Sequence, residues 1–255
     1  MSVATCRDND ALNARERIGA FDALRGFSVI SMVLFHYCYD VRFIAGHDLP
    51  FFEPPLQYVW RCSISWAFVF IAGCMSVYSR SNARRSLKYL TLAAAIFVVT
   101  SVVSVDTPIS FGVIFCMGAC TLVSHLINSA GLRPRGWLPA ILLLVLFVFA
   151  VHVPEGYVGV PGMTVRLPRE LYSTPWLSWL GFPGPQFSSG DYYPLIPYLF
   201  LYLSGQSWAR EMKSVGYPAW FTKLRLAPLE FIGRHALEIY VIHQPILLLI
   251  SGSIA

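Results

Sequence analysis

Residues 18–45 read IGAFDALRGFSVISMVLFHYCYDVRFIA, and this stretch decides the fold class. It is long and apolar enough to cross a bilayer as one helix, which takes about 20 residues. At about 100° per residue, four of its ionisable side chains gather on one helix face. They are Asp22, Arg25, His36 and Asp40, with Gly26 beside them. Such groups are costly in hydrocarbon, so this face should meet protein or a watery cavity.

His36 stands one helical turn before Asp40, and the two residues form the candidate reaction centre. A nearby carboxylate can fix the tautomer of an imidazole and raise its basicity, as acid–base catalysis requires. We therefore predict that both residues are catalytic and lie in the external half of the first span. The structural alternative is a buried histidine whose ring bonds a neighbouring backbone group.

The composition is that of an integral membrane protein. Of the 255 residues, 56% are hydrophobic and 13% are charged, against roughly a quarter charged in soluble domains. The mean hydropathy is +0.56. We predict an all-α, polytopic membrane helix bundle, because a membrane barrel would need short alternating strands. The net charge of +5 does not indicate nucleic-acid binding, since the basic residues punctuate the apolar runs and form no patch.

Apolar runs, separated by turn and charge signals, predict about seven transmembrane helices. The predicted spans are 22–45, 61–79, 88–105, 109–128, 137–153, 192–209 and 229–252. A polar cytoplasmic leader, 1–17, precedes them, and without a clear cleavage site we expect the first span to be retained. The whole of 1–255 is treated as a single transmembrane domain.

The basic residues set the orientation. With the N-terminus in the cytoplasm, 15 of the 19 Lys and Arg residues lie on the cytoplasmic side. Short cytoplasmic loops of membrane proteins carry such an excess of Lys and Arg. The four exceptions are Arg42, Arg61, Arg166 and Arg169. Seven spans then place the C-terminus outside.

The longest connection, 154–191, becomes an external loop in this topology. A loop of this length is either functional or disordered. Its aromatic residues argue against disorder; they are Tyr172, Trp176, Trp179 and Phe182. We expect a folded loop over the external mouth of the bundle.

At the cytoplasmic entry of the first span, Asp22, Arg25 and Gly26 allow two interpretations. Asp22 and Arg25 could form an i, i+3 ion pair that anchors the helix end. Alternatively, Arg25 could clamp a phosphate or carboxylate of a cofactor, with Asp22 and Gly26 beside it. Periodicity does not separate these alternatives.

The last span contains FIGRHALEIYVIHQPILLL, residues 231–249. Arg234 could pair with Glu238 or contact a cofactor at the cytoplasmic edge. His243 could line a cavity with His36, or cap a carbonyl freed by Pro245, which removes a helix hydrogen bond and is expected to kink the span.

Three further polar residues are candidates for binding the substrate. Asp191 and Tyr192 stand at the external start of the sixth predicted span, where an acid also makes a favourable helix-dipole contact. His47 lies in the first external loop, either solvated or as a second base.

Six cysteines, at 6, 38, 62, 74, 116 and 120, lie mostly in or beside apolar runs. Buried thiols are therefore expected, with a bridge between Cys38 and Cys62 left open. No metal is predicted, because neither HExxH nor CxxC spacing occurs.

Five blocks together resemble the heparan-α-glucosaminide N-acetyltransferase catalytic-domain family, in the right order over nearly the whole chain. They are RIGAFDALRGFSVISMVLFHYCYD, FVFIAGCMS, ISFGVIFCMGA, FSSGDYYPLIPYLFLYLSG and FIGRHALEIYVIHQPIL. The resemblance is to the short bacterial branch, which carries the first-span histidine and following aspartate, here His36 and Asp40. The reactive histidine of the lysosomal branch falls nearer the place of His47.

The resemblance implies transmembrane acetyl transfer from cytoplasmic acetyl-CoA. The acceptor would be an amine or hydroxyl of an amino sugar or envelope glycan; heparan sulfate is not expected, because the chain is much shorter than the lysosomal enzymes. A bacterial inner-membrane location and a homodimer are implied by resemblance alone. The alternatives are a small transporter or proton-coupled permease, since intramembrane charges also mark ion pathways, and a non-catalytic scaffold.

Overall fold

The computed structural model describes residues 18–103 and 107–252. The predicted leader, 1–17, and Cys6 lie outside the described residues. The chain divides into two compact units: residues 1–58 and 217–255 belong to unit 1, and residues 59–216 belong to unit 2.

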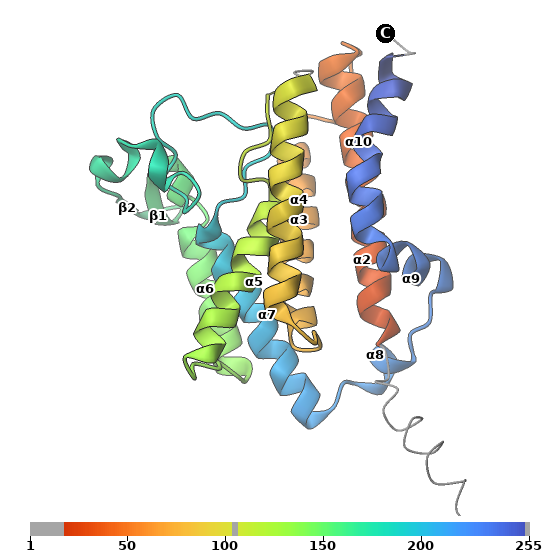
Figure 1. Ribbon diagram of the computed structural model, residues 1–255, viewed down its shortest axis with the longest axis vertical. Coiled ribbons are helices and arrows are strands. Elements are labelled where there is room, and N and C mark those ends of the chain that lie inside the picture. The colour runs from red at the N-terminus through yellow and green to blue at the C-terminus, as the bar shows by residue number, and fades with distance from the viewer. Residues whose placement is uncertain (1–17, 104–106, 253–255) are drawn as a thin grey trace, which may run out of the picture. The chain divides into compact units, whose positions relative to one another are not determined.

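Unit 1 is built around α2 (Gly19–Tyr39), which continues directly into the π-helix η1 (Asp40–Ile44). Along its length, α2 packs against α9 (Ala227–Arg234) and α10 (Ala236–Gly252), and it also contacts the short α8 (Ala219–Lys223). Figure 1 shows α2, in orange, beside α10, in blue. This arrangement joins the first and last predicted spans of the chain.

Two glycines allow α2 and α9 to cross closely. A Cβ atom on Gly26 would overlap the backbone carbonyl of Leu229, and one on Gly233 would overlap the carbonyl of Asp22. Small residues permit such close approaches between membrane helices. In lipid the hydrophobic effect does not drive helices together, so van der Waals packing between them contributes more. The Gly26 of the charged face is therefore a packing residue.

The last predicted span, 229–252, is not one continuous helix. It is broken at His235 into α9 and α10, whose axes differ by 80°. Helix α10 continues through Pro245, so the break of this span lies at His235, and the expected kink at Pro245 stays a prediction. Gly233 lies two residues before the bend, at the crossing of α9 over α2, and the RHALE sequence that follows it has no Gly or Pro.

Unit 2 contains five helices: the main part of α3 (Leu56–Ser76), α4 (Asn82–Val103), α5 (Val113–Ser129), α6 (Trp137–Ala150) and α7 (Leu195–Val215). Helix α4 packs on α5, and α7 packs on α5 and α6. The core includes Val69, Cys116, Phe147 and Tyr202, all fully buried. The five described cysteines are free thiols, so the bridge between Cys38 and Cys62 is not formed.

The long connection between α6 and α7 is folded, as its aromatic content predicts. It forms a hairpin of β1 (Tyr157–Val160) and β2 (Met163–Arg166), with Tyr157 opposite Arg166. Three short 3₁₀ helices complete it: η2 (Val153–Glu155), η3 (Arg169–Tyr172) and η4 (Pro175–Leu177). Figure 1 shows the hairpin beside the end of α6. The protein is thus mainly helical, with one small antiparallel sheet that the all-α prediction omitted.

Four helical segments are long and apolar enough to cross a membrane: Gly19–Ile44, Leu56–Ser76, Asn82–Val103 and Trp137–Glu155. The bent pair α9 and α10 makes a fifth if it is one span. Helix α5 is apolar but has 17 residues, and α7 carries Arg210, Glu211 and Lys213 in its last turns. An integral membrane protein is therefore supported, whereas the predicted count of seven spans stays a prediction.

Candidate active site

The candidate reaction centre lies within unit 1, where α2 and η1 meet α10. His36 is in the last turn of α2, Asp40 is the first residue of η1, and His243 and Gln244 are neighbours on α10. The ring centroids of His36 and His243 are 4.9 Å apart. Asp40 is fully buried and His243 is 7% exposed. The fold thus brings together two residues predicted in the first span and one predicted in the last.

The hydrogen bond made by His243 fixes which of its ring nitrogens is basic. Its Nδ1 lies 2.6 Å from the carbonyl oxygen of Tyr240. A carbonyl only accepts hydrogen bonds, so Nδ1 carries the proton and donates it. The lone pair of the neutral ring is then on Nε2, which is buried and has no hydrogen-bond partner among the described residues. His243 therefore lies beside His36 and bonds the carbonyl of Tyr240, whereas the carbonyl freed by Pro245 would be that of Val241. Its role in a cavity stays a prediction.

Asp40 is held by α10. The side-chain amide of Gln244 donates to both carboxylate oxygens of Asp40, at 3.0 and 3.1 Å. In the described part of the chain, no hydrogen bond joins the His36 ring to Asp40, so the expected direct orientation of the imidazole by this carboxylate is not seen. Asp40 instead fixes Gln244, the residue next to His243, and so positions the second imidazole.

The start of the π-helix coincides with Asp40. The amide of Ala45 donates to the carbonyl of Asp40 at 2.8 Å, the five-residue spacing of a π turn. Such single turns are rare and concentrate at functional sites. Around it, Phe35 packs on the fully buried Phe52, with ring centroids 5.0 Å apart. Apolar side chains therefore pack beside Asp40 and His36.

The Asp22 and Arg25 pair is also in unit 1, at the other end of α2. The Arg25 Nη1 atom lies 3.3 Å from Asp22 Oδ1 and donates to the carbonyl of Gly233 at 3.2 Å. The ion-pair interpretation is realised, and Arg25 in addition caps the last turn of α9. Its side chain stays 21% exposed, so the role of anion clamp stays a prediction.

Arg234 is exposed at the end of α9. Its expected partner Glu238 lies beyond the 80° bend, and within the described residues no ion pair joins them. The i, i+4 spacing holds only on a continuous helix. Its predicted cofactor contact is untested.

His47 lies in the exposed segment after η1, where its backbone amide bonds the carbonyl of Val41 at 3.0 Å. Nearby Arg42 pairs with Asp48 and, at 2.9 Å, with Glu53. His47 is thus exposed, as expected for a solvated residue. The role of His47 as a second base stays a prediction.

Asp191 and Tyr192 belong to unit 2. The carboxylate of Asp191 accepts the backbone N–H of Val113 at 3.0 Å, the first residue of α5. The helix-dipole contact considered from sequence is therefore made, but to α5 and not to α7. Burial raises the pKa of Asp191 to about 6. The Tyr192 hydroxyl donates to the carbonyl of Ser178 at 2.6 Å.

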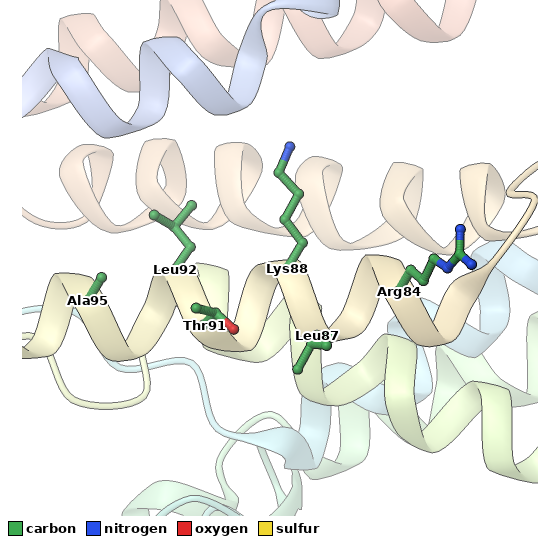
Figure 2. A pocket seen from close by; sticks show the side chains of 6 residues that line it. All are labelled: Arg84, Leu87, Lys88, Thr91, Leu92 and Ala95. Carbon is green, nitrogen blue, oxygen red and sulfur yellow. The ribbon is translucent and has the colours of Figure 1, made fainter.

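Two features escaped the sequence analysis. Gln244 follows His243 directly, and this HQP order was the available signal that a second polar side chain would enter the site. A hollow of about 550 Å³ also lies along α4. Figure 2 shows that its lining comes from this helix alone, with the cationic ends of Arg84 and Lys88 followed by Leu92 and Ala95. It combines a basic end with an apolar floor.

Comparison with known proteins identifies the family of the chain. Residues 17–245 match the family described as heparan-alpha-glucosaminide N-acetyltransferase, catalytic. The match spans both units and every residue of the candidate reaction centre. Neither the curated proteins nor the solved structures yield a match. Because the matched range covers most of its length, the chain belongs to the heparan-alpha-glucosaminide N-acetyltransferase catalytic-domain family of membrane acetyltransferases.

Proposed function

We propose that this protein transfers an acetyl group from cytoplasmic acetyl-CoA to an amine or hydroxyl of an amino sugar or envelope glycan. The observation that carries the proposal is the pair of adjacent imidazoles, the half-buried His36 and the buried His243, of which His243 presents a basic nitrogen without a partner among the described residues. Acyl transfer needs such a group to remove the acceptor proton. Family membership supplies the reaction class.

In the proposed reaction, the acceptor N–H or O–H attacks the thioester carbonyl while His36 accepts its proton. The new C–N or C–O bond forms as the C–S bond breaks, and the proton passes from imidazolium to the departing thiolate. A transient acetyl-imidazole on His36 is the two-step variant. His243 supports either route, because its ring lies beside that of His36 and its Nε2 is free to accept a proton.

The donor would approach from the cytoplasmic side. Its phosphates require cations, and each unit offers its own candidates. Unit 1 has the exposed Arg234 and the part-exposed Arg25, and unit 2 has the α4 hollow with Arg84 and Lys88 (Figure 2). Asp191, Tyr192 and His47 are the proposed contacts of the acceptor on the external side. We further propose that the chain crosses the membrane seven times with its N-terminus in the cytoplasm. It would lie in the inner membrane of a bacterium and form a homodimer.

Two histidine variants test it. Purified His36→Ala should keep the thermal unfolding temperature of the wild type and lose acetyl transfer by at least about 100-fold, the usual contribution of a general base. His243→Phe keeps an aromatic ring but lacks Nε2, and its transfer rate should fall by a comparable factor. The assay incubates proteoliposomes with labelled acetyl-CoA and envelope extract, and identifies the acetylated components by mass.

Wild-type turnover in His36→Ala would refute the catalytic assignment. A matched control is His125→Ala, because His125 lies on α5 in unit 2 and is not among the proposed site residues; its turnover should be unchanged. Solute flux without consumption of acetyl-CoA would instead favour a permease.

A further inference from the structure

A basic groove lies at one end of unit 2, where α3 and α7 end and the connection between α5 and α6 passes. Its volume is about 360 Å³, within the range of about 300–1,000 Å³ typical of small-molecule sites. Its lining comprises Val77, Arg133, Arg135, Arg210, Lys213 and Ser214. Four of these six side chains are cations.

Arg210 is held in a fixed orientation at the inner wall of the groove. It donates to the carbonyl of Pro134 at 3.0 Å and to the side-chain oxygen of Asn128 at 2.7 Å. Asn128 in turn donates to the fully buried Gln206, whose amide reaches Ser76 at 2.6 Å. A buried polar network across α3, α5 and α7 therefore sets the position of this guanidinium.

The other three cations keep donor atoms available. Arg133 uses its Nε to reach the carbonyl of Asn128, and Arg135 uses its Nε to reach Glu211 at 3.2 Å. The outer nitrogens of both guanidinium groups have no hydrogen-bond partner in the described part of the chain. Lys213 lies over the ring of Tyr78, with Nζ 5.4 Å from its centroid.

The charges in the groove are unbalanced. Glu211 is the single carboxylate that pairs with one of its four cations among the described residues. Like charges held this close repel one another, and the repulsion weakens only with salt or a bound counter-ion. An anion with several oxygen acceptors would relieve it.

Helix capping accounts for only part of this arrangement. Arg133 bonds the carbonyl of Asn128 in the last turn of α5, as cations at helix C-termini commonly do. The backbone carbonyl that Arg210 bonds is that of Pro134, in the connection between α5 and α6. Neither Arg135 nor Lys213 bonds a carbonyl among the described residues, although both line the same hollow. Their presence there is unexplained by capping.

We propose that this groove binds a phosphate-bearing anion. The planar fork of a guanidinium matches the oxygens of a phosphate, and Lys adds a point charge. The size of the groove fits a diphosphate or a phosphate ester, which comes either from a soluble ligand or from a lipid headgroup. The assignment rests on unit 2 alone and stands whether or not the protein transfers acetyl groups.

The test uses the full chain in nanodiscs. In phosphatidylcholine discs, pyrophosphate binding is measured by calorimetry; in a second arm, discs with phosphatidylglycerol are analysed for retained lipid by native mass spectrometry. Arg135→Gln and Lys213→Gln should each weaken binding about tenfold in one arm, since a charge-assisted hydrogen bond contributes at least that factor. Raising the salt concentration should weaken it further.

Arg166→Gln is the matched control, because Arg166 is an exposed arginine on β2 that does not line the groove. Weakened pyrophosphate binding in the groove variants supports a soluble phosphate, and weakened lipid retention supports a headgroup. If both arms give the same binding for wild type, control and groove variants, or no binding at all, the proposal is overturned.

Discussion

At the scale of single residues, Asp40 acts through a neighbour and not on the imidazole that precedes it in the sequence. Its carboxylate receives two hydrogen bonds from Gln244, and Gln244 carries His243 into contact with His36. Because Asp40 is fully buried, these two bonds also offset part of the cost of removing its charge from water. The structure thus links Asp40 to the His243 side of the pair, and its predicted catalytic role stays a prediction.

A double-mutant cycle on Asp40 and Gln244 tests this link. Gln244→Leu should lower the free energy of unfolding by about 1.5–3 kcal/mol, because the buried carboxylate loses charged hydrogen bonds. In the Asp40→Asn background the same change should cost much less, giving a coupling energy of about 1 kcal/mol or more. Thermal unfolding in detergent measures both values; strictly additive effects would contradict the pairing.

At the scale of secondary structure elements, two close contacts shape the units. One is the crossing of α2 and α9 at Gly26 and Gly233. It lies just before the bend of 80° between α9 and α10. The other joins the segment before α7 to the start of α5, where Asp191 accepts the Val113 N–H and Gly112 leaves room for the carboxylate. Both contacts depend on glycines with no space for a side chain.

Gly233→Ala should destabilise unit 1 strongly, because the added methyl would overlap the carbonyl of Asp22 and force the two helices apart. Overpacking of this kind costs about 1–3 kcal/mol, and backbone overlap lies at the upper end. Gly252→Ala is the control, since a methyl there meets no atom within 4 Å. Equal unfolding temperatures for the two variants would contradict the crossing.

The raised pKa of Asp191 predicts a pH dependence of stability. Burial raises the pKa to about 6 from an ordinary value of 3.8. Between these values the folded protein holds a proton that the unfolded chain has lost, so the free energy of unfolding falls as pH rises from about 4 to about 6. The contribution is on the order of 3 kcal/mol.

Asp191→Asn removes this titration while it keeps a side-chain acceptor for the Val113 amide. The difference in unfolding free energy between wild type and variant, measured from pH 4 to pH 7, should therefore change through this window and level off above it. A constant difference across the range would mean that Asp191 titrates near its ordinary pKa.

At the scale of the whole molecule, the distribution of basic residues supports the proposed orientation. The groove cations Arg133, Arg135 and Lys213 are gathered at one end of unit 2, and all belong to the predicted cytoplasmic set. The hairpin and its flanking turns join α6 to α7 at their other ends.

Labelling of introduced cysteines in intact cells tests this topology. Met163→Cys, on an exposed position of the hairpin, should react with a membrane-impermeant maleimide added outside. Ser214→Cys, beside the groove, should react only after the cells are opened. The wild type gives the background from its own thiols. Reaction of Ser214→Cys in intact cells would reverse the proposed orientation.

The sequence by itself determined the class of protein. Long apolar runs can bury their backbone polar groups in lipid only as helices, so a membrane helix bundle followed from composition and segment length. The single charged face of 18–45 likewise marked where polar chemistry would concentrate, because ionisable groups avoid hydrocarbon. The order of short blocks along the chain indicated the family.

Only the tertiary structure decided which residues meet. The partner of Asp40 is about 200 positions away in sequence, and no local periodicity relates them. The break at His235 lies two residues after Gly233, where α9 crosses α2, and the π turn that begins at Asp40 contains neither Gly nor Pro. Helical spacing fixes neighbours on one helix, whereas the contact between His36 and His243 requires two helices to pack at a defined register.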